Sequence, residues 1–583
     1  MKGFDVLKVK SAVKDHNKFD LSRTHLTTMN FGEIVPLMAE ETVPGDKFSV
    51  NADFFSRLAP LVKPTYGKFQ FKTVAGYVPY HMIADDAEAW IQGKTAWEGN
   101  TPVQRYFTME SLANFVVNFC ITAGTSANTE FTYTTAAGTL TYKTFTKRGK
   151  YWIKVLNALG YALPSAVDLQ TGSTWMTTIA PLKLSAYPLL AFFKLYNDYM
   201  SQSQRFNTSP LTNLLNAIKH GRLISGSYTP STGEITHVCL QTMFNNLLLN
   251  YENDYFTSAW QAANTPLGST YDFISGSEVP GSSSSYARSL ASTQYENTLG
   301  IGSGISKIGQ RALDFLKSFD DWVRRNNYSG SRAVQEVYSR FGIKTSDYRS
   351  NYAQVIGTDT MPIQVGDVTA TADAGTTPLG DYAGKGIMNG SKSISIQCDD
   401  YGMLLILGYF TVTPMNPYGF DRKVLRVDPL DYYTPEFDGL GADAISVGEY
   451  FANPTISSSR VADNATFGFT ERYNAYRYGR DQITGEFRNY KPDADMNCWH
   501  AGRNMNAVRE GGYLVAQNSA VNTLPQIDSE YNRIFSVTSG DVDHFYLTAH
   551  FNVDAVRPML NLNQVPNLGE GDTAVPRNGN VIS

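Results

Sequence analysis

The sequence predicts a mainly β protein, a sandwich of antiparallel strands into which helices and long loops are inserted. Aromatic residues make up 13% of the 583 residues, and most are the strand-forming Tyr and Phe. The 47 glycines and 25 prolines supply many turns. In DHFYLTAHFNVDAV, at 543–556, apolar residues at every second position from Phe545 to Val553 alternate with more polar ones. This period of two places one set of side chains on a core face and the other on a wetter face.

Similar strand patterns occur at 67–79, 129–146 and 393–413. Because strands near both chain ends flank an irregular middle, we expect distant segments to close one sandwich, as they do in a jelly roll. The sandwich should come mainly from roughly 20–100 and 385–560.

The middle of the chain, roughly 101–384, has a different character. Its apolar residues recur at helical spacing, which predicts helices near 185–200, 307–325 and 332–341. The Ser- and Gly-rich stretch at 275–292 is typical of an exposed loop. We interpret these parts as insertions into a single subunit spanning 1–583, rather than as separate domains.

Neither membrane insertion nor secretion is expected. The longest apolar run, MLLILGYF at 403–410, is far shorter than the roughly twenty residues that span a bilayer. It is typical of a strand buried on both faces. The first ten residues, MKGFDVLKVK, contain no signal-peptide core. The four cysteines are widely spaced, which favours reduced structural thiols.

The candidates for catalysis are weak, and we expect no enzyme, no cofactor and no metal site. His544 and His550 share a strand face but lie about 20 Å apart along it. Adjacent acids, such as Asp85 and Asp86, usually point in different directions. GIGSGISK at 300–307 lacks the spacing of a phosphate-binding loop.

One strip interleaves arginines and aromatics, FGFTERYNAYRYGRDQITGEFR at 467–488. Arginine can neutralise phosphate and an aromatic ring can stack on a base, but Arg and Tyr are also frequent in protein interfaces. The strip carries four arginines against three acids, and the whole chain has a net charge of −5, which favours protein contacts over DNA contacts. The candidate interface or DNA-facing residues are Arg472, Tyr473, Tyr476, Arg477, Tyr478, Arg480 and Arg488.

Eight blocks along the chain resemble, in order, the major capsid proteins of microviruses, the small single-stranded DNA bacteriophages, and most closely the gokushovirus-like branch. They include FDLSRTHLTTMNFGEIVPLMAEETVPGDKF, YVPYHMI, AYPLLAFFKLYNDYM, YENDYFTSAWQAANTP, GSRAVQEVYSRFGIKTSDYR, VDPLDYYTPEFDGLG, the strip with CWHAGR, and DHFYLTAHFNVDAVRPMLNLNQVPNL. The chain departs from the family at Leu560, where a proline is more usual. The Thr-rich segment near 121–180 has no counterpart in the family, and we interpret it as a lineage-specific surface insertion.

The resemblance implies an eight-stranded jelly-roll subunit that assembles into a T=1 icosahedral shell around circular single-stranded DNA. The implied partners are copies of itself, the packaged DNA, and minor virion, scaffolding or small basic DNA-associated proteins. A host cell-surface receptor is a further implied partner, and assembly is expected in the bacterial host cytoplasm.

The alternative is a soluble β-sandwich carbohydrate-binding protein or hydrolase. A secretory signal and converging carboxylates would favour that alternative, and neither is visible in the sequence. A free-standing nucleic-acid-binding protein would need a basic balance, which the net charge of −5 disfavours.

Overall fold

The fold is described from a computed structural model of the chain. The described residues are 16–96, 101–120, 131–135, 138–142, 145–163, 178–201, 210–247, 249, 252, 254–256, 258, 259, 318, 338, 339, 341–343, 352–369, 382–416, 419–438, 442–450, 466–487, 495–502, 529–538 and 542–559. Apart from a few single residues, the helices predicted at 307–325 and 332–341 therefore lie outside the described residues, as do the loop at 275–292, Arg488 and Leu560.

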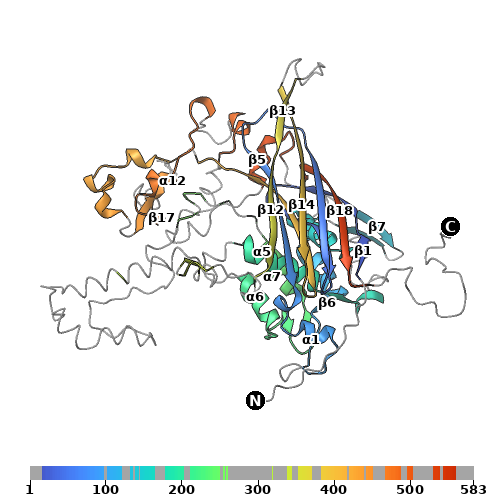
Figure 1. Ribbon diagram of the computed structural model, residues 1–583. Coiled ribbons are helices and arrows are strands. Elements are labelled where there is room, and N and C mark those ends of the chain that lie inside the picture. The colour runs from blue at the N-terminus through green and yellow to red at the C-terminus, as the bar shows by residue number, and fades with distance from the viewer. Residues whose placement is uncertain are drawn as a thin grey trace, which may run out of the picture.

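The chain is mainly β, as predicted, and its two large sheets are antiparallel (Figure 1). In the first sheet the order is β1-β18-β4-β14-β13, and β2 also pairs with β18. Its strands are β1 (Asn17–Asp20), β2 (Arg23–Met29), β4 (Lys47–Leu58), β13 (Gln364–Thr369), β14 (Tyr382–Gln397) and β18 (Phe545–Arg557). The second sheet has the order β12-β5-β15-β3, with β3 (Ile34–Thr42), β5 (Phe69–Pro79), β12 (Gln354–Pro362) and β15 (Gly402–Val412).

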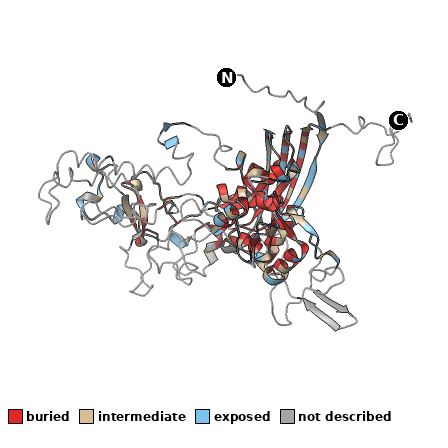
Figure 2. Ribbon diagram, turned by 90° about the horizontal axis from the view of Figure 1, so that it is seen from below, coloured by how far each residue is buried: buried red, intermediate tan, exposed pale blue. Residues whose placement is uncertain are grey.

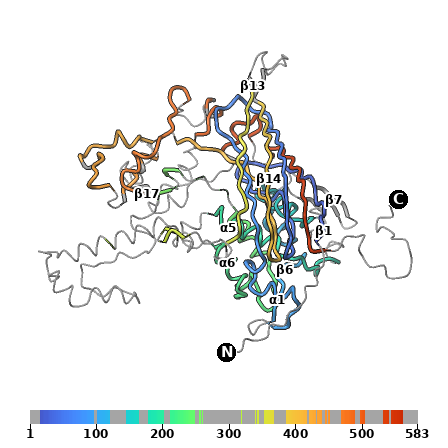
Figure 3. The backbone as a smooth tube through the Cα atoms, viewed as in Figure 1, coloured from blue at the N-terminus to red at the C-terminus, as the bar shows by residue number. Residues whose placement is uncertain are grey.

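Strands from the two ends of the chain lie side by side in the first sheet (Figure 3). Asn17 pairs with Arg557, and Arg23 pairs with Phe551. The alternation predicted for the last strand is confirmed, because Phe545 and every second residue to Val553 are buried in β18. The sandwich is thus closed by segments that are distant in the sequence.

The core between the sheets is aromatic. Phe410 of the second sheet stacks on Phe545 of the first with ring centroids 4.0 Å apart. Phe54 and Phe71 meet across the same interface at 5.6 Å. In β4, the even-numbered positions from Phe48 to Leu58 point into this core, and the odd-numbered ones are exposed. Buried residues therefore concentrate along the strands and the helices packed on them (Figure 2).

A layer of helices covers the outer face of the second sheet. Almost all of β15 is buried, as predicted for a strand covered on both faces. Helix α5 (Tyr187–Tyr199), within the predicted 185–200, packs on β5 and β15. The approach is so close at Gly76 that a Cβ atom there would lie 2.5 Å from Leu195 of α5. A larger residue at 76 would push the helix away from the sheet.

The helical layer is held together by aromatic rings in stacked and edge-to-face contacts. Phe115 lies 5.5 Å from Trp152 and 5.2 Å from Phe244, and Phe193 lies 5.2 Å from Phe244. These rings come from α2 (Met109–Phe115), α3 (Lys147–Ala158), α7 (His237–Asn245) and α5; α6 (Pro210–Lys219) packs beside α5 and α7. No helix in the described part of the chain is long and apolar enough to cross a membrane.

The remaining elements are short. A small sheet has the order β10-β11-β6-β9, with β6 (Tyr106–Thr108), β9 (Lys183–Ser185), β10 (Tyr228–Thr229) and β11 (Glu234–Ile235). The pattern at 129–146 forms a hairpin of β7 (Phe131–Thr135) and β8 (Gly138–Tyr142). The other short elements are α1 (Ala87–Ile91), η1 (Tyr80–Met82), η2 (Val116–Cys120), β16 (Ala442–Ser446), α12 (Val447–Tyr450), β17 (Thr466–Glu471) and the single turns η5 (Arg422–Val424), η6 (Pro429–Asp431), η7 (Pro435–Phe437), η8 (Asn474–Tyr476), η9 (Gly485–Phe487), η10 (Asp495–Trp499) and η11 (Ser529–Ile534).

Candidate interface region

The arginine–tyrosine strip lies in a lateral module beside the sandwich, at the left of Figure 1. We define this module as the described residues 419–438, 442–450 and 466–487. Its centre is the two-stranded ribbon of β16 and β17, in which Ala442 pairs with Glu471. The strip begins in β17 and continues through η8, so its arginines and tyrosines all follow the ribbon, in and around the turn η8.

Arg477 is the most exposed arginine of the strip within the described residues, and it bridges two carboxylates. Its guanidinium donates to Glu471 at 2.9 Å and to Asp438 at 3.0 Å. Half of its side chain is exposed, so each pair contributes only about 0–1 kcal/mol to stability. Arg477 therefore keeps an accessible edge while being held in place.

Arg480 differs from Arg477 because its partners are backbone carbonyls and not carboxylates. Its guanidinium donates to the carbonyl oxygen of Phe420 and, at 3.2 Å, to that of Asn416. Asn416 lies just beyond β15 of the sandwich. Arg480 thus ties the strip to the chain that leaves the second sheet.

Tyr473 is buried and has left-handed backbone angles, with φ at +61°. It is the single non-glycine residue with positive φ in the described part of the chain, and this conformation costs about 1–2 kcal/mol. Its ring packs against Tyr433, with centroids 5.2 Å apart, and the guanidinium of Arg472 lies over the ring at 5.1 Å. Arg472 also lies over Phe437 at 5.5 Å. Ring packing holds the strained turn in place.

The two remaining tyrosines face different partners. The hydroxyl oxygen of Tyr476 accepts from the backbone N–H of Tyr433 at 3.1 Å, and Arg426 lies 3.9 Å above its ring. Tyr478 stacks on Tyr255, with centroids 5.0 Å apart and an interplanar angle of 19°. Tyr255 lies far earlier in the sequence than the module, so its contact with Tyr478 joins the module to a distant part of the chain.

The carboxylate of Glu449 is buried beside Tyr255, the ring on which Tyr478 stacks. Glu449 accepts from Arg422 at 2.7 Å, and Tyr255 donates to its second oxygen at 3.2 Å. Arg422 also forms a two-pronged contact with Asp443 at 3.1 and 3.2 Å. Burial lowers the pKa of Arg422, but the two carboxylates outweigh it and the net pKa is raised. Burial beside Glu449 raises the pKa of Tyr255 well above its usual value.

Large apolar side chains on the module surface form what we call the exposed patch. Val427 is 90% exposed, far more than a core residue would tolerate. The patch consists of Phe420, Val424, Val427, Tyr432, Tyr433 and Tyr476. Aromatic residues beside arginine, in a region short of lysine, are typical of the buried centre of a protein–protein interface.

Comparison with known proteins identifies the family of this chain. The chain matches the family described as capsid protein (F protein) over residues 7–149 and 303–568, which is more than half of its length. It belongs to that capsid protein family. The strip and every strand of both large sheets fall within the matched residues, whereas 150–302 lies outside them.

Two similar proteins are viral capsid subunits. The chain is 23% identical to Capsid protein VP1 of Chlamydia phage 1 over 600 residues, covering 94% of this chain and 95% of that protein. It is 21% identical to Capsid protein VP1 of Bdellovibrio phage phiMH2K over 595 residues, covering 95% of each. The protein is thus a structural phage capsid protein and a component of the virion, and the resemblance seen in its sequence is confirmed.

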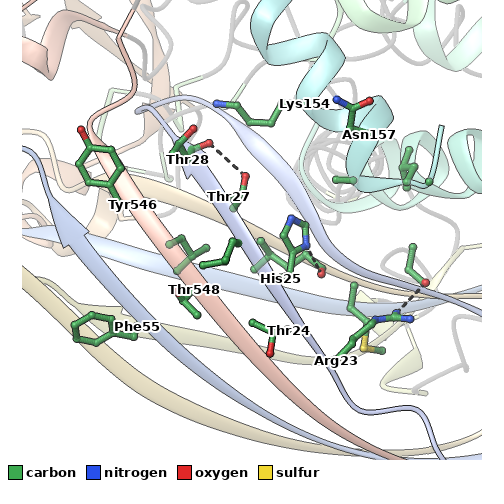
Figure 4. A pocket seen from close by; sticks show the side chains of 18 of the residues that line it. Arg23, Thr24, His25, Thr27, Thr28, Phe55, Lys154, Asn157, Tyr546 and Thr548 are labelled. Carbon is green, nitrogen blue, oxygen red and sulfur yellow. Dashed lines mark hydrogen bonds between the residues drawn. The ribbon is translucent and has the colours of Figure 1, made fainter. Parts of the chain in front are cut away.

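The capsid protein also carries an open groove of about 1120 Å³ where α3 approaches the edge strands β2 and β3 (Figure 4). His25 bonds the carbonyl of Leu37 at 2.8 Å, which holds the two edges together. Lys154 of α3 pairs with Glu33 at 2.7 Å, and burial raises the pKa of Glu33 although Lys154 opposes this. The lining side chains are mainly Thr, aliphatic and basic, and the hydroxyl oxygen of Thr24 lies 2.9 Å from Nδ1 of His550.

Sequence reasoning identified the strip but missed its supporting residues. The structure brings Arg472, Tyr473, Tyr476, Arg477, Tyr478 and Arg480 into one module, while Arg488 lies outside the described residues. Arg422, Asp443 and Glu449 were not singled out. The nearest signal was the family-like block at 427–441, which lies between Arg422 and Asp443.

Proposed function

We propose that this capsid protein assembles into a T=1 icosahedral shell, with one subunit per asymmetric unit, around a circular single-stranded DNA genome. Family membership carries the proposal, since the matched residues include every strand of the sandwich. Closed symmetric assembly lets one set of self-complementary contacts recur over the whole shell.

We interpret the eight main strands as a jelly roll within one subunit spanning residues 1–583. The pairing supports this, because β2, β18, β4 and β14 form one four-stranded layer and β3, β15, β5 and β12 form the other. Successive strands mostly alternate between the layers, as the two Greek keys of a jelly roll require. The insertion-rich part was expected at roughly 101–384, but β12 (Gln354–Pro362) and β13 (Gln364–Thr369) belong to the two large sheets, so only the rest of that range would be insertions, with the segment near 121–180 at the outer surface.

The lateral module is proposed to contact other subunits through the strip and the exposed patch. Arg477 and Arg480 already have carboxylate or carbonyl partners, which favours a fixed protein surface over a phosphate-binding one. DNA contact by the strip is the second candidate, since Arg477 retains a half-exposed guanidinium. Arg488 is included in both candidates.

The net charge of −5 supports a virion in which a protein other than this chain neutralises the DNA. The packaged DNA needs counter-charge that this chain does not supply in excess, so a small basic DNA-associated protein is a fitting partner. Scaffolding or minor virion proteins and a host cell-surface receptor complete the proposed partners. Assembly is proposed to occur in the bacterial host cytoplasm.

Expression of the full chain, alone and with the other virion proteins of its phage, tests the proposal. Negative-stain microscopy should show uniform isometric particles, and nuclease treatment should leave protected single-stranded DNA in those made with the phage genome. A chain that stays monomeric under every assembly condition would overturn the shell. Particles that never protect DNA would overturn the packaging part alone.

A further inference from the structure

Three metal-ligating side chains from three different elements meet at one end of the sandwich, near α1 at the bottom of Figure 1. His81 lies in η1, Glu88 in the first turn of α1, and Asp400 in the turn between β14 and β15. The Nδ1 atom of His81 lies 3.4 Å from a carboxylate oxygen of Asp400 and 3.7 Å from one of Glu88. One ligand atom from each residue lies within 4.8 Å of the other two.

The backbone around these side chains is fixed by buried groups. The hydroxyl of Tyr77 donates to the carbonyl of Asp400 at 2.7 Å, and the amide of Asp400 donates back to that hydroxyl at 3.2 Å. The amide of Tyr80 donates to the carbonyl of Tyr401 at 2.9 Å, which ties η1 to the same turn. Tyr77 and Tyr80 are both buried. The ligands therefore start from positions that need little ordering when a cation binds.

The spacing and charge of the cluster fit a small divalent cation. Zinc binds imidazole nitrogen and carboxylate oxygen at about 2.0–2.2 Å, which puts neighbouring tetrahedral ligands about 3.3–3.6 Å apart. The separations of His81 Nδ1 from Asp400 and Glu88, 3.4 and 3.7 Å, fall at or just beyond this range, and all three ligand atoms lie within 4.8 Å of one another. Two carboxylates and a neutral imidazole carry two negative charges, which one divalent cation balances. Ca²⁺ is a poorer fit, because it takes about 6–8 oxygen ligands.

We infer that His81, Glu88 and Asp400 form a binding site for a divalent transition metal of the Zn²⁺ class. The site uses one imidazole nitrogen and two carboxylate oxygens, and a water completes the coordination. The ion would join η1, α1 and the β14–β15 turn, so its role is to stabilise this end of the subunit. The inference is independent of the shell and of the DNA.

Metal binding by the full chain, freed of metal with a chelator, tests the inference. Titration with Zn²⁺ in a calorimeter should give one equivalent per chain, and Co²⁺ should produce visible absorption bands of a nitrogen- and oxygen-ligated ion. Zn²⁺ should also raise the unfolding temperature, since it binds the folded state. His81→Ala, Glu88→Gln and Asp400→Asn should each weaken Zn²⁺ binding by at least about tenfold.

His220→Ala is the matched control. His220 contacts Asp85 at 2.6 Å, so it belongs to a histidine–carboxylate pair outside the cluster, and its variant should bind Zn²⁺ like the wild type. Equal binding by wild type and all three cluster variants would overturn the site, and so would the lack of saturable binding by the wild type. Preference for Ca²⁺ over Zn²⁺ would overturn the assigned metal class. Glu88 is partly exposed, so Glu88→Gln keeps the test decisive if the other variants fold poorly.

Discussion

Arg422 and Glu449 form an ion pair of 2.7 Å in which the Glu449 side chain is almost fully buried. The pair joins η5 to α12 within the lateral module. Removing one partner of a buried pair leaves an uncompensated charge, which costs far more than the pair contributes when intact.

We therefore expect Arg422→Ala to destabilise the lateral module by about 3–5 kcal/mol. Backbone amides in 442–450 should exchange with deuterium faster, and proteases should cut the module sooner, while β4 and β18 stay protected. Lys18→Ala is the control, because Lys18 and Asp554 form an exposed pair worth about 0–1 kcal/mol. Unchanged exchange at 442–450 in the Arg422 variant would show that the module does not depend on this pair.

Arg477 allows the interface role of the strip to be separated from its folding role. Its pairs with Glu471 and Asp438 are half exposed and contribute about 0–1 kcal/mol each, so Arg477→Ala should cost less than about 2 kcal/mol of subunit stability. If the strip contacts another subunit, the same variant should lower the yield of assembled particles several-fold. Lys423→Ala, at another exposed cation of the module, should leave the yield unchanged. Normal particles with reduced DNA content would instead favour the DNA-facing alternative.

Tyr473 tests whether ring packing or the hydroxyl group holds the left-handed turn. Its hydroxyl is buried without a hydrogen-bond partner among the described residues, so Tyr473→Phe should be neutral or slightly stabilising. Tyr473→Ala removes the ring from Tyr433 and Arg472 and should cost about 3 kcal/mol or more. Urea denaturation of both variants measures the difference. A loss as large for Phe as for Ala would mean that the hydroxyl, rather than the ring, holds the turn.

Local patterns predicted the strands of the sandwich well, because the burial of a strand residue and the period of two depend on residues that are close in the sequence. The alternation at 545–553 identified the core face of β18, and the apolar run at 403–410 identified β15. Pairing partners were not predictable in this way. No local signal says that Arg23 lies opposite Phe551, since that register depends on the closure of the whole sheet.

In the candidate interface region, too, the sequence did not predict which residues contact one another. Composition singled out the arginines and tyrosines of the strip, yet their partners Asp438 and Phe420 lie outside it. The proposed metal site gave no spacing signal at all, because Asp400 is separated from His81 and Glu88 by more than half of the chain. Contacts between distant segments therefore carry most of the information that the sequence patterns lack.

His500, in the block that follows the strip, should make stability depend on pH. Its Nε2 faces the carbonyl of Phe487 at 3.0 Å, and the amide of Gly502 donates to its Nδ1 at 3.0 Å. This arrangement needs the neutral ring, because a protonated Nδ1 cannot accept. Burial lowers the pKa of His500 below 6.5, and the nearby Arg533 lowers it further.

The unfolded chain therefore takes up this proton before the folded chain does. The contribution of His500 to stability is complete above pH 6.5 and is lost as the pH falls toward the lower pKa of the folded state. In that window the wild type should lose up to about 1.4 kcal/mol per pH unit relative to His500→Gln, whose amide can both donate and accept without titrating. Urea denaturation of both proteins, from neutral pH downward, measures this difference and cancels the contribution of His544, whose pKa burial also lowers. Parallel stability curves would mean that His500 is not held neutral by these contacts.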